Sequence, residues 1–472
     1  MSHSRRDFLR RSGCAALSMA ALASNIRHFG LMDAMAQKNA DAAPDVDYKA
    51  MVCIFMNGGN DGNNTVVPNH TAGYAQYSAA RAAQGLALPQ SSLLPITPPS
   101  IGLDYGLHPN LPELKTLWDQ QKLAVICNVG TLVQPLTRAQ YQSGSPRPMQ
   151  LFSHSDQSNQ HRTSISNSAS TTGWGGRIGD RTIGLNPGAA ISAITSVAGS
   201  TVFTAGNATT PLVVSPSPTP LNQVFALNGF TAGNNEDSAR RQSMNLIRAM
   251  DPDKTLIRAA SDLTQQAISV SDQLSADPAL TATFPNTPLG NQLKQIAKLM
   301  KFHTQLNMSR QIFYVQSNAI FDTHSGQLAR QVQTLTEVSQ AMKAFYDETV
   351  AQNIASQVTT FTLSDFSRTL NPNGSGSGSG TDHAWGNHVF VMGGSVRGGD
   401  FYGTPGPNGT VFPTLVNGGP DDADTRGRFI PTTSVDMFAA TLASWYGVSA
   451  QDIPLVFPNI NAFPTANLGF MM

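Results

Sequence analysis

Short apolar segments recur along the chain, separated by longer polar stretches. They are rich in β-branched and aromatic residues and show no strict alternation of apolar and polar positions, which is typical of strands buried on both faces. We therefore predict five buried strands, at residues 50–56, 123–129, 311–317, 358–363 and 388–393.

Helical periodicity fills much of the sequence between these strands. Apolar residues recur at helical spacing over 256–274, 289–300 and 328–345. Ser434 is a predicted N-cap for a helix from Val435 to Tyr446 that stops at Gly447. Strands that alternate with amphipathic helices predict an α/β fold, with a mostly parallel central sheet flanked by helices.

Two segments differ from this pattern. Residues 190–235 hold Thr, Val, Ser and Pro in short extended stretches, which predicts a small β-rich insertion. Residues 373–380 alternate Gly and Ser after Asn373, which is typical of a flexible loop. Neither segment separates two independent halves, so we predict a single α/β domain over residues 37–472.

Composition narrows the class of partner. Charged residues make up only 13% of the 472 residues, and 30 basic residues balance 30 acidic ones. A neutral, weakly charged chain has no electrostatic footprint for nucleic acid, so we predict no nucleic-acid partner.

The first 36 residues look like an export signal. Arg5-Arg6 is followed by Asp-Phe-Leu, and a mild apolar run from Cys14 to Ala23 is too short to span a bilayer. Ala34-Met-Ala36 then offers a cleavage site. This arrangement resembles a twin-arginine signal, which implies export of a folded protein by the twin-arginine machinery to the periplasm or cell exterior. An Arg-rich amphipathic start is the alternative. We predict no transmembrane segment in the mature chain.

Two cysteines remain after the signal. Cys53 and Cys127 both lie inside predicted strands, and neither is part of a C-x-x-C motif. We predict two buried thiols, with one disulfide as the alternative.

Carboxylates and imidazoles follow the predicted strands. Open α/β sheets bind ligands at the carboxyl ends of their strands, and Asp and His side chains are donors for divalent cations. The candidates that follow a strand or the Gly/Ser loop are Asp61, Asp322, His324, Asp365, Asp382, His383 and His388, with Ser153 and His154 downstream of the second strand.

Each candidate also has a structural interpretation. Asp61 fits a turn, Asp322 and His324 fit a helix N-cap with a surface histidine, and Asp365 fits a salt bridge with Arg368. One of the two late histidines fits a packed, hydrogen-bonded position. The four other histidines of the mature chain are predicted to be structural or exposed; they are His70, His108, His161 and His303.

Several motifs together resemble a known bacterial family. They are G-G-N-D-G-N-N-T-V-V-P (58–68), L-H-P-N-L (107–111), Ser153-His154, F-D-T-H (321–324), S-D-F-S-R-T (364–369) and T-D-H-A-W-G-N-H (381–388). This set resembles the family called domain of unknown function 1501 from about Met51 to Phe463. That family is in turn similar in fold to the alkaline phosphatase and sulfatase superfamily.

The superfamily resemblance implies metal ligands in a fixed order along the chain. Asp61, then Asp322 with His324, then Asp365, then His383 reproduce most of that order, with Asp382 and His388 as further candidates. Phe366 stands where the superfamily usually has a histidine. This departure leaves open a single-metal or a metal-free site.

The resemblance also implies a nucleophile at a helix N-terminus. Ser153, beside His154, is the first candidate and Thr65 the second; Asp156 is the acidic residue available to pair with this segment. Arg368 or Arg397 would bind the oxyanion charge. Neither cysteine lies in a formylglycine motif, which excludes a type I sulfatase, and the absence of G-x-S-x-G and G-x-G-x-x-G disfavours an α/β-hydrolase esterase and a dinucleotide site.

Two hypotheses of function follow. The first is an exported hydrolase of phosphate or sulfate esters, on a small molecule or a glycan, that depends on Zn²⁺, Mn²⁺ or Ca²⁺. The second is a non-catalytic cell-envelope protein that keeps the fold and a structural cation while binding a glycan or a partner. A complete ligand set with a nucleophile would favour the first.

Overall fold

The computed structural model describes residues 47–472 apart from 225–228, 230–234, 249–260, 262–263, 266–267, 275 and 319. The predicted export signal therefore lies outside the described residues. Nine of the 19 residues of the predicted helix over 256–274 lie outside them too, whereas its last apolar positions, Val270 and Leu274, are described and buried.

The central sheet contains all five predicted strands. They are β1 (Lys49–Met56), β5 (Leu123–Gly130), β8 (Arg310–Ser317), β9 (Val358–Ser364) and β12 (Asn387–Gly393). Among the described residues the strand order is β13-β5-β12-β9-β1-β8-β6-β7, and β14 pairs with β5. The short added strands are β6 (Ile194–Ser196), β7 (Leu212–Val213), β13 (Phe401–Tyr402) and β14 (Thr433–Ser434).

The sheet is parallel except at one strand. Strand β12 runs antiparallel to β5 and to β9, whereas β1 pairs in parallel with β8 and β9. The start of β12 therefore lies beside the end of β5, with Asn387 opposite Val129. The carboxyl ends of β1, β5, β8 and β9 consequently share one edge of the sheet.

The segment 190–235 extends this sheet. Strand β6 pairs in parallel with β8, and β7 pairs in parallel with β6 at the edge of the sheet. The Gly/Ser loop connects β10 (Arg368–Asn373) to β11 (Gly380–His383), and these two strands form an antiparallel hairpin. A second small sheet joins β2 (Val66–Pro68), β4 (Tyr105–Leu107) and β3 (Leu94–Ile96). The sequence predicted neither small sheet.

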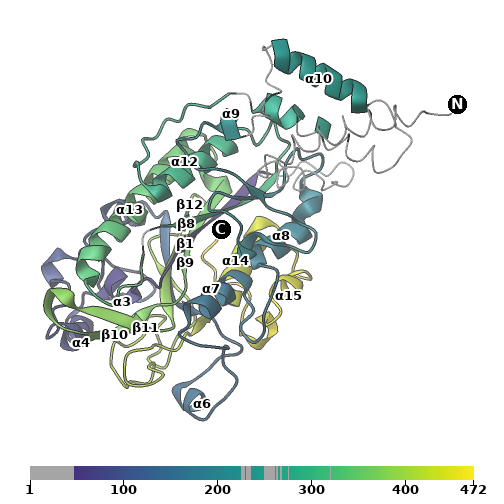
Figure 1. Cartoon of the computed structure of the whole chain (residues 1–472). Coiled ribbons are helices and arrows are strands. Elements are labelled where there is room, and N and C mark those ends of the chain that lie inside the picture. Colours follow the sequence, from purple (N-terminus) through teal and green to yellow (C-terminus); the bar gives the residue numbers. More distant parts are fainter. Residues whose placement is uncertain are drawn as a thin grey trace.

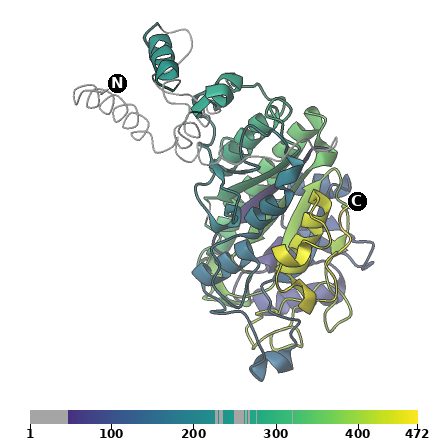
Figure 2. The same cartoon turned by 90° about the vertical axis from the view of Figure 1, so that its right-hand side faces the viewer.

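Helices cover both faces of the sheet (Figure 1). Helices α12 (Pro288–Met300) and α13 (Gln327–Ala351) pack on one side, with α7 (His154–Thr163), α8 (Trp174–Thr182) and α14 (Val435–Tyr446) on the other. Figure 2 shows the C-terminal segment, in yellow, beside the strands and α10 (Asn235–Arg248) standing apart from this core. Further α-helices are α3 (Gly62–Thr65), α4 (Thr71–Arg81), α5 (Pro112–Asp119), α6 (Arg138–Gln142), α9 (Leu221–Val224) and α15 (Ile453–Val456).

Helix α14 has the predicted boundaries. The Ser434 hydroxyl oxygen accepts the backbone N–H of Met437 at 3.0 Å, and Gly447 ends the helix at a φ of 124°. A side chain at that φ would be strained, so glycine suits the position. Nearly every residue of α14 is buried, which explains its apolar sequence.

Cys53 and Cys127 are buried, free thiols, as predicted. Cys53 lies in β1 and Cys127 in β5. None of the helices in the described part of the chain combines the length and the apolar character needed to cross a bilayer.

Candidate functional site

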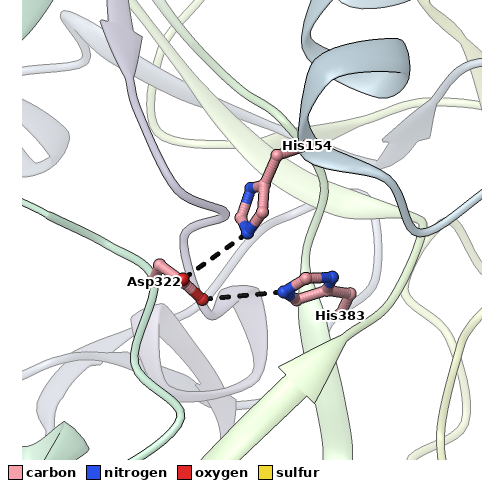
Figure 3. Close-up of side chains that lie close together, drawn as sticks. All are labelled: His154, Asp322 and His383. Atoms are coloured by element: carbon pink, nitrogen blue, oxygen red, sulfur yellow. Dashed lines mark ion pairs between the residues drawn. The ribbon is translucent and has the colours of Figure 1, made fainter.

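Three side chains from distant parts of the sequence meet at the carboxyl edge of the sheet (Figure 3). His154 is the first residue of α7, Asp322 follows β8, and His383 ends β11. The His154 Nε2 atom lies 3.6 Å from Asp322 Oδ2, and His383 Nε2 lies 3.6 Å from Asp322 Oδ1. One donor atom from each residue falls within 4.8 Å of the others, a spacing that one cation can bridge.

A third imidazole reaches the same carboxylate. His324 Nε2 lies 3.1 Å from Asp322 Oδ1 and 2.9 Å from His383 Nε2. The His324 side chain is 46% exposed, whereas those of His154 and His383 are more enclosed. The site thus has a partly open side, and three Nε2 atoms face one carboxylate. We call these four residues, His154, Asp322, His324 and His383, the Asp322 cluster.

Acceptors hold the opposite nitrogen of each ring. Asp365 Oδ2 lies 2.7 Å from His154 Nδ1, the Phe152 carbonyl 2.7 Å from His383 Nδ1, and Asp382 Oδ1 3.0 Å from His324 Nδ1. Each acceptor fixes a proton on Nδ1, so that in the neutral ring the Nε2 lone pair faces Asp322. Metal-binding histidines are oriented in this way. Asp365 and Asp382, which the sequence predicted as ligands, therefore orient two of the histidines.

These contacts shift pKa values within the Asp322 cluster. The hydrogen bond that His154 donates to Asp365 raises the pKa of His154 above its ordinary value, because the carboxylate favours the charged ring. Burial lowers the pKa of His383, and the neighbouring positive groups lower it further. Burial alone would raise the pKa of Asp322, but the hydrogen bond and charge of Arg368 outweigh it and hold this pKa below its usual range.

Phe366 closes one wall of the cluster. Its ring centroid lies 4.7 Å from those of both His154 and His383. The position at which the superfamily pattern has a histidine thus provides an apolar wall here and no donor atom.

Arg368 holds Asp322 in place. Its side chain is fully buried and donates from Nη1 to Asp322 Oδ1 at 2.8 Å and from Nε to Thr381 Oγ1 at 3.3 Å. The sequence predicted that this guanidinium would clamp a substrate oxyanion, whereas the structure engages it with protein groups. Arg397 follows the inverted strand β12 and so lies at the opposite edge of the sheet.

The family described as "Protein of unknown function (DUF1501)" matches residues 48–411. The chain belongs to this family. No curated protein matches the sequence.

Three solved structures are distantly similar to this DUF1501 protein. Ps i-CgsB in complex with k-i-k-neocarrahexaose has 8% identity and a TM-score of 0.32, with 88% of this chain and 77% of that chain covered. The lipoteichoic acid synthase LtaP from Listeria monocytogenes has 7% identity and a TM-score of 0.31, covering 85% and 79%. PsFucS1 sulfatase from Pseudoalteromonas sp. has 9% identity and a TM-score of 0.28, covering 75% and 64%.

Asp61 of this DUF1501 protein is paired with an arginine. Arg81 donates from Nη1 to Asp61 Oδ2 at 2.6 Å, and both side chains are almost completely buried. The other oxygen accepts the backbone N–H of Asn63 at 3.0 Å, and Gln327 also donates to the carboxylate. The structure therefore gives Asp61 a salt bridge and a helix cap, which differs from the predicted role of metal ligand.

The glycines beside Asp61 permit a close approach between two loops. Gly58 has a φ of 110°, and a Cβ there would lie 2.5 Å from the backbone nitrogen of Asp322. The Gly58 N–H also donates to Asp365 Oδ2 at 3.2 Å, and its carbonyl accepts from Arg368. The motif predicted to carry a ligand thus supports the Asp322 cluster from behind.

Both predicted nucleophiles make local hydrogen bonds. Ser153 caps α7: its hydroxyl oxygen accepts the N–H of Asp156 at 3.4 Å, and the hydroxyl donates to Asp156 Oδ2 at 2.5 Å. Asp156 does pair with this segment, but within the first turn of the helix. Thr65 is buried and donates to the Asp61 carbonyl at 2.8 Å.

His388 lies in the protein core. Its ring stacks on Phe412 at 4.5 Å with a 10° interplanar angle, and Nδ1 accepts the N–H of Asn128 at 3.3 Å. Burial lowers the pKa of His388 to about 3. The structure therefore separates this predicted ligand from the Asp322 cluster. His70, His108, His161 and His303 also lie outside the cluster.

This buried histidine predicts an acid-sensitive fold. Above the ordinary histidine pKa of 6.5, His388 is neutral in both the folded and the unfolded chain. Below pH 6.5 the histidine becomes protonated in the unfolded chain, whereas in the folded chain it stays neutral down to about pH 3. Stability is therefore lost as the pH falls below 6.5. We expect His388→Gln to reduce this loss by about 2–3 kcal/mol between pH 6.5 and 4.5.

Urea unfolding at several pH values measures the effect. His303→Gln, at a half-buried position, serves as the control. Equal acid sensitivity in the wild type and His388→Gln would contradict the buried, neutral state of His388.

Several residues around the cluster carried no sequence signal. Arg428 donates from Nε to the His383 carbonyl at 2.9 Å and lies over the Phe152 ring at 4.1 Å. Arg426 forms an ion pair with Asp382. These arginines lie in a loop without strand or helix periodicity, so the spacing of the sequence could not connect them to the site.

Proposed function

We propose that this DUF1501 protein binds a divalent cation at the Asp322 cluster and uses it to hydrolyse phosphate or sulfate esters. The observation that carries the proposal is the convergence of three imidazole Nε2 atoms on Asp322, each with its Nδ1 held by an acceptor. His154, Asp322 and His383 would be the main ligands, with His324 as a further one.

Protein hydrogen bonds do not satisfy all the Nε2 atoms of the Asp322 cluster. His154 Nε2 is buried and has no hydrogen-bond partner among the described residues. His324 Nε2 and His383 Nε2 lie 2.9 Å apart, and with both Nδ1 atoms protonated the two lone pairs would face each other. A shared cation removes that repulsion and satisfies His154 as well, so the donor set fits a metal ion.

The donor types favour Zn²⁺ or Mn²⁺ over Ca²⁺. Imidazole nitrogen is a ligand for Zn²⁺ and related ions, whereas Ca²⁺ takes oxygen ligands. A bound cation would polarise the ester and offset its negative charge. Arg368 would keep Asp322 ionised and oriented, and Asp365 and Asp382 would keep two imidazoles aimed at the cation.

The attacking group in this proposal is water. Ser153 and Thr65 are engaged in local hydrogen bonds, so neither is presented to an ester as a free hydroxyl. The lack of a free nucleophilic hydroxyl at these two residues also favours a second function, a non-catalytic cell-envelope protein that holds a structural cation and binds a glycan or a partner. Measured ester hydrolysis distinguishes the enzyme from the binding protein.

The test measures hydrolysis of a panel of phosphate and sulfate esters, of small molecules and of glycans, by the protein loaded with Zn²⁺ or Mn²⁺. We expect activity in the wild type and its loss in His383→Ala. Ser153→Ala is expected to keep the activity while losing about 1 kcal/mol of stability with its helix cap. Loss of activity in a folded Ser153→Ala would restore serine as the nucleophile, and cation binding without turnover would favour the envelope protein.

We also propose that residues 1–36 direct export by the twin-arginine machinery to the periplasm or the cell exterior. The paired Arg5 and Arg6, the short apolar run and Ala34-Met-Ala36 support this proposal. Replacing both arginines by lysine is expected to stop export, measured by fractionation of cells; continued export would contradict the proposal.

A further inference from the structure

A cavity of about 580 Å³ lies apart from the side chains of the Asp322 cluster. Its wall includes Pro135 and Arg138 after β5, Pro407, Asp421, and Thr432 just before β14. Strand β14 pairs with the end of β5, with Thr433 opposite Val129. The cavity therefore opens at the same edge of the sheet as the cluster.

One carboxylate in the wall has an unsatisfied oxygen. Asp421 is 3% exposed. Its Oδ2 accepts the N–H of Thr414 at 3.0 Å, but its Oδ1 has no hydrogen-bond partner in the part of the chain that the structure describes. Burial raises the pKa of Asp421, although hydrogen bonds from Thr414 oppose the shift. A buried acceptor without a donor is costly, and a ligand that brings a donor would remove this cost.

The other groups in the wall indicate which donor fits. Arg138 donates to the carbonyls of Gly419 and Asp424 at 2.6 and 2.7 Å and forms no ion pair with any described carboxylate. Its positive charge disfavours an ammonium ligand. Threonine hydroxyls and a glutamine amide both donate and accept, which suits hydroxyl groups. These side chains are Thr137, Gln140, Thr404 and Thr432.

Prolines make the remaining walls apolar and rigid. Because the proline ring fixes φ, such walls lose little freedom when a ligand binds. The volume lies within the range of ordinary small-molecule sites. The five prolines are Pro135, Pro405, Pro407, Pro420 and Pro431.

We propose that this cavity binds a neutral carbohydrate, with a sugar hydroxyl donating to Asp421 Oδ1 and the apolar ring face against the prolines. The binding needs no cation. As an extension that rests on the proposed function, the cavity would hold the sugar part of a glycan ester.

A single loop connects the cavity with the Asp322 cluster. Asp422, next to Asp421, is fully buried and accepts the backbone N–H groups of Gly418, Asp424, Gly427 and Arg428 at 2.8–3.1 Å. The same loop places Arg428 on the His383 carbonyl. The loop is therefore held as one unit, with Asp421 at the cavity and Arg428 at the cluster.

Saturation-transfer NMR on the purified chain tests the proposal, with maltose, cellobiose and lactose as probes and choline as the ammonium comparison. We expect saturation of at least one disaccharide and none of choline. Asp421→Asn replaces the free acceptor by a donor of the same shape. Gly406→Ala places a methyl carbon 3.1 Å from Asp421 Oδ1. Each change is expected to raise the sugar Kd at least tenfold.

Two matched variants serve as controls. Gly184→Ala adds a methyl group where nothing lies within 4 Å, and Asp119→Asn changes an exposed carboxylate; both should keep the wild-type Kd. EDTA and His154→Ala should also leave it unchanged, so failed hydrolysis with intact sugar binding would overturn the proposed function alone.

Three results would overturn the carbohydrate site. They are no saturation of any disaccharide, an unchanged Kd in both folded cavity variants, and loss of sugar binding in EDTA, which would place the sugar at the cation site. Saturation of choline in place of the sugars would reassign the cavity to a cationic ligand.

Discussion

Replacing Arg81 with alanine is expected to lower the free energy of unfolding by about 3–5 kcal/mol. The change leaves the Asp61 carboxylate buried without its countercharge, because both partners are almost fully enclosed. It also removes donors to the carbonyls of Leu370 and Thr369, at 3.0 and 2.9 Å. Urea unfolding followed by circular dichroism measures the loss.

An exposed ion pair provides the control. Lys115 and Asp119 lie one helical turn apart on the surface, so Lys115→Ala should cost no more than about 0.5 kcal/mol. Asp61→Asn, which keeps the side-chain shape, should also destabilise the fold but leave cation binding intact. A stable Asp61→Asn variant that loses the cation would reinstate Asp61 as a ligand.

Removal of the cation is expected to cause the second large loss of stability. A cation that binds only the folded chain contributes about 2.7 kcal/mol when its free concentration is a hundred times Kd. EDTA should therefore lower the Tm of chain loaded with Zn²⁺ or Mn²⁺. His154→Ala and Asp322→Ala should abolish this response because each removes a proposed ligand.

His388→Gln is the matched control for this experiment. The structure places this histidine in the core, so its replacement should leave the response to EDTA intact. A wild-type chain that melts identically with EDTA, Zn²⁺ and Mn²⁺ would contradict the cation site and leave the cluster as a network of hydrogen bonds.

The strands and the last helix were predictable because local signals determine them. The segment at 50–56 is apolar throughout and that at 358–363 is rich in β-branched residues, as is typical of strands covered on both faces, and Ser434 and Gly447 mark the ends of α14. Strand direction carries no such signal. The inverted β12 and the β10–β11 hairpin depend on pairing partners elsewhere in the chain.

The site was predictable in location but less so in the role of each residue. Asp322 was a candidate because it follows a predicted strand, His383 because it follows the Gly/Ser loop, and His154 because it lies downstream of the second predicted strand. Asp61 looked equally suitable, yet its partner Arg81 lies 20 residues away on another element. Sequence spacing does not show which carboxylate faces an arginine and which faces an imidazole.

The most direct test of the cation site is an anomalous X-ray measurement on crystals of the chain grown with Zn²⁺. We expect one anomalous peak about 2.0–2.2 Å from His154 Nε2, His383 Nε2 and an Asp322 oxygen, and no peak there in His154→Ala crystals. An anomalous map without density between these three side chains, or with zinc bound only elsewhere on the protein, would contradict the account.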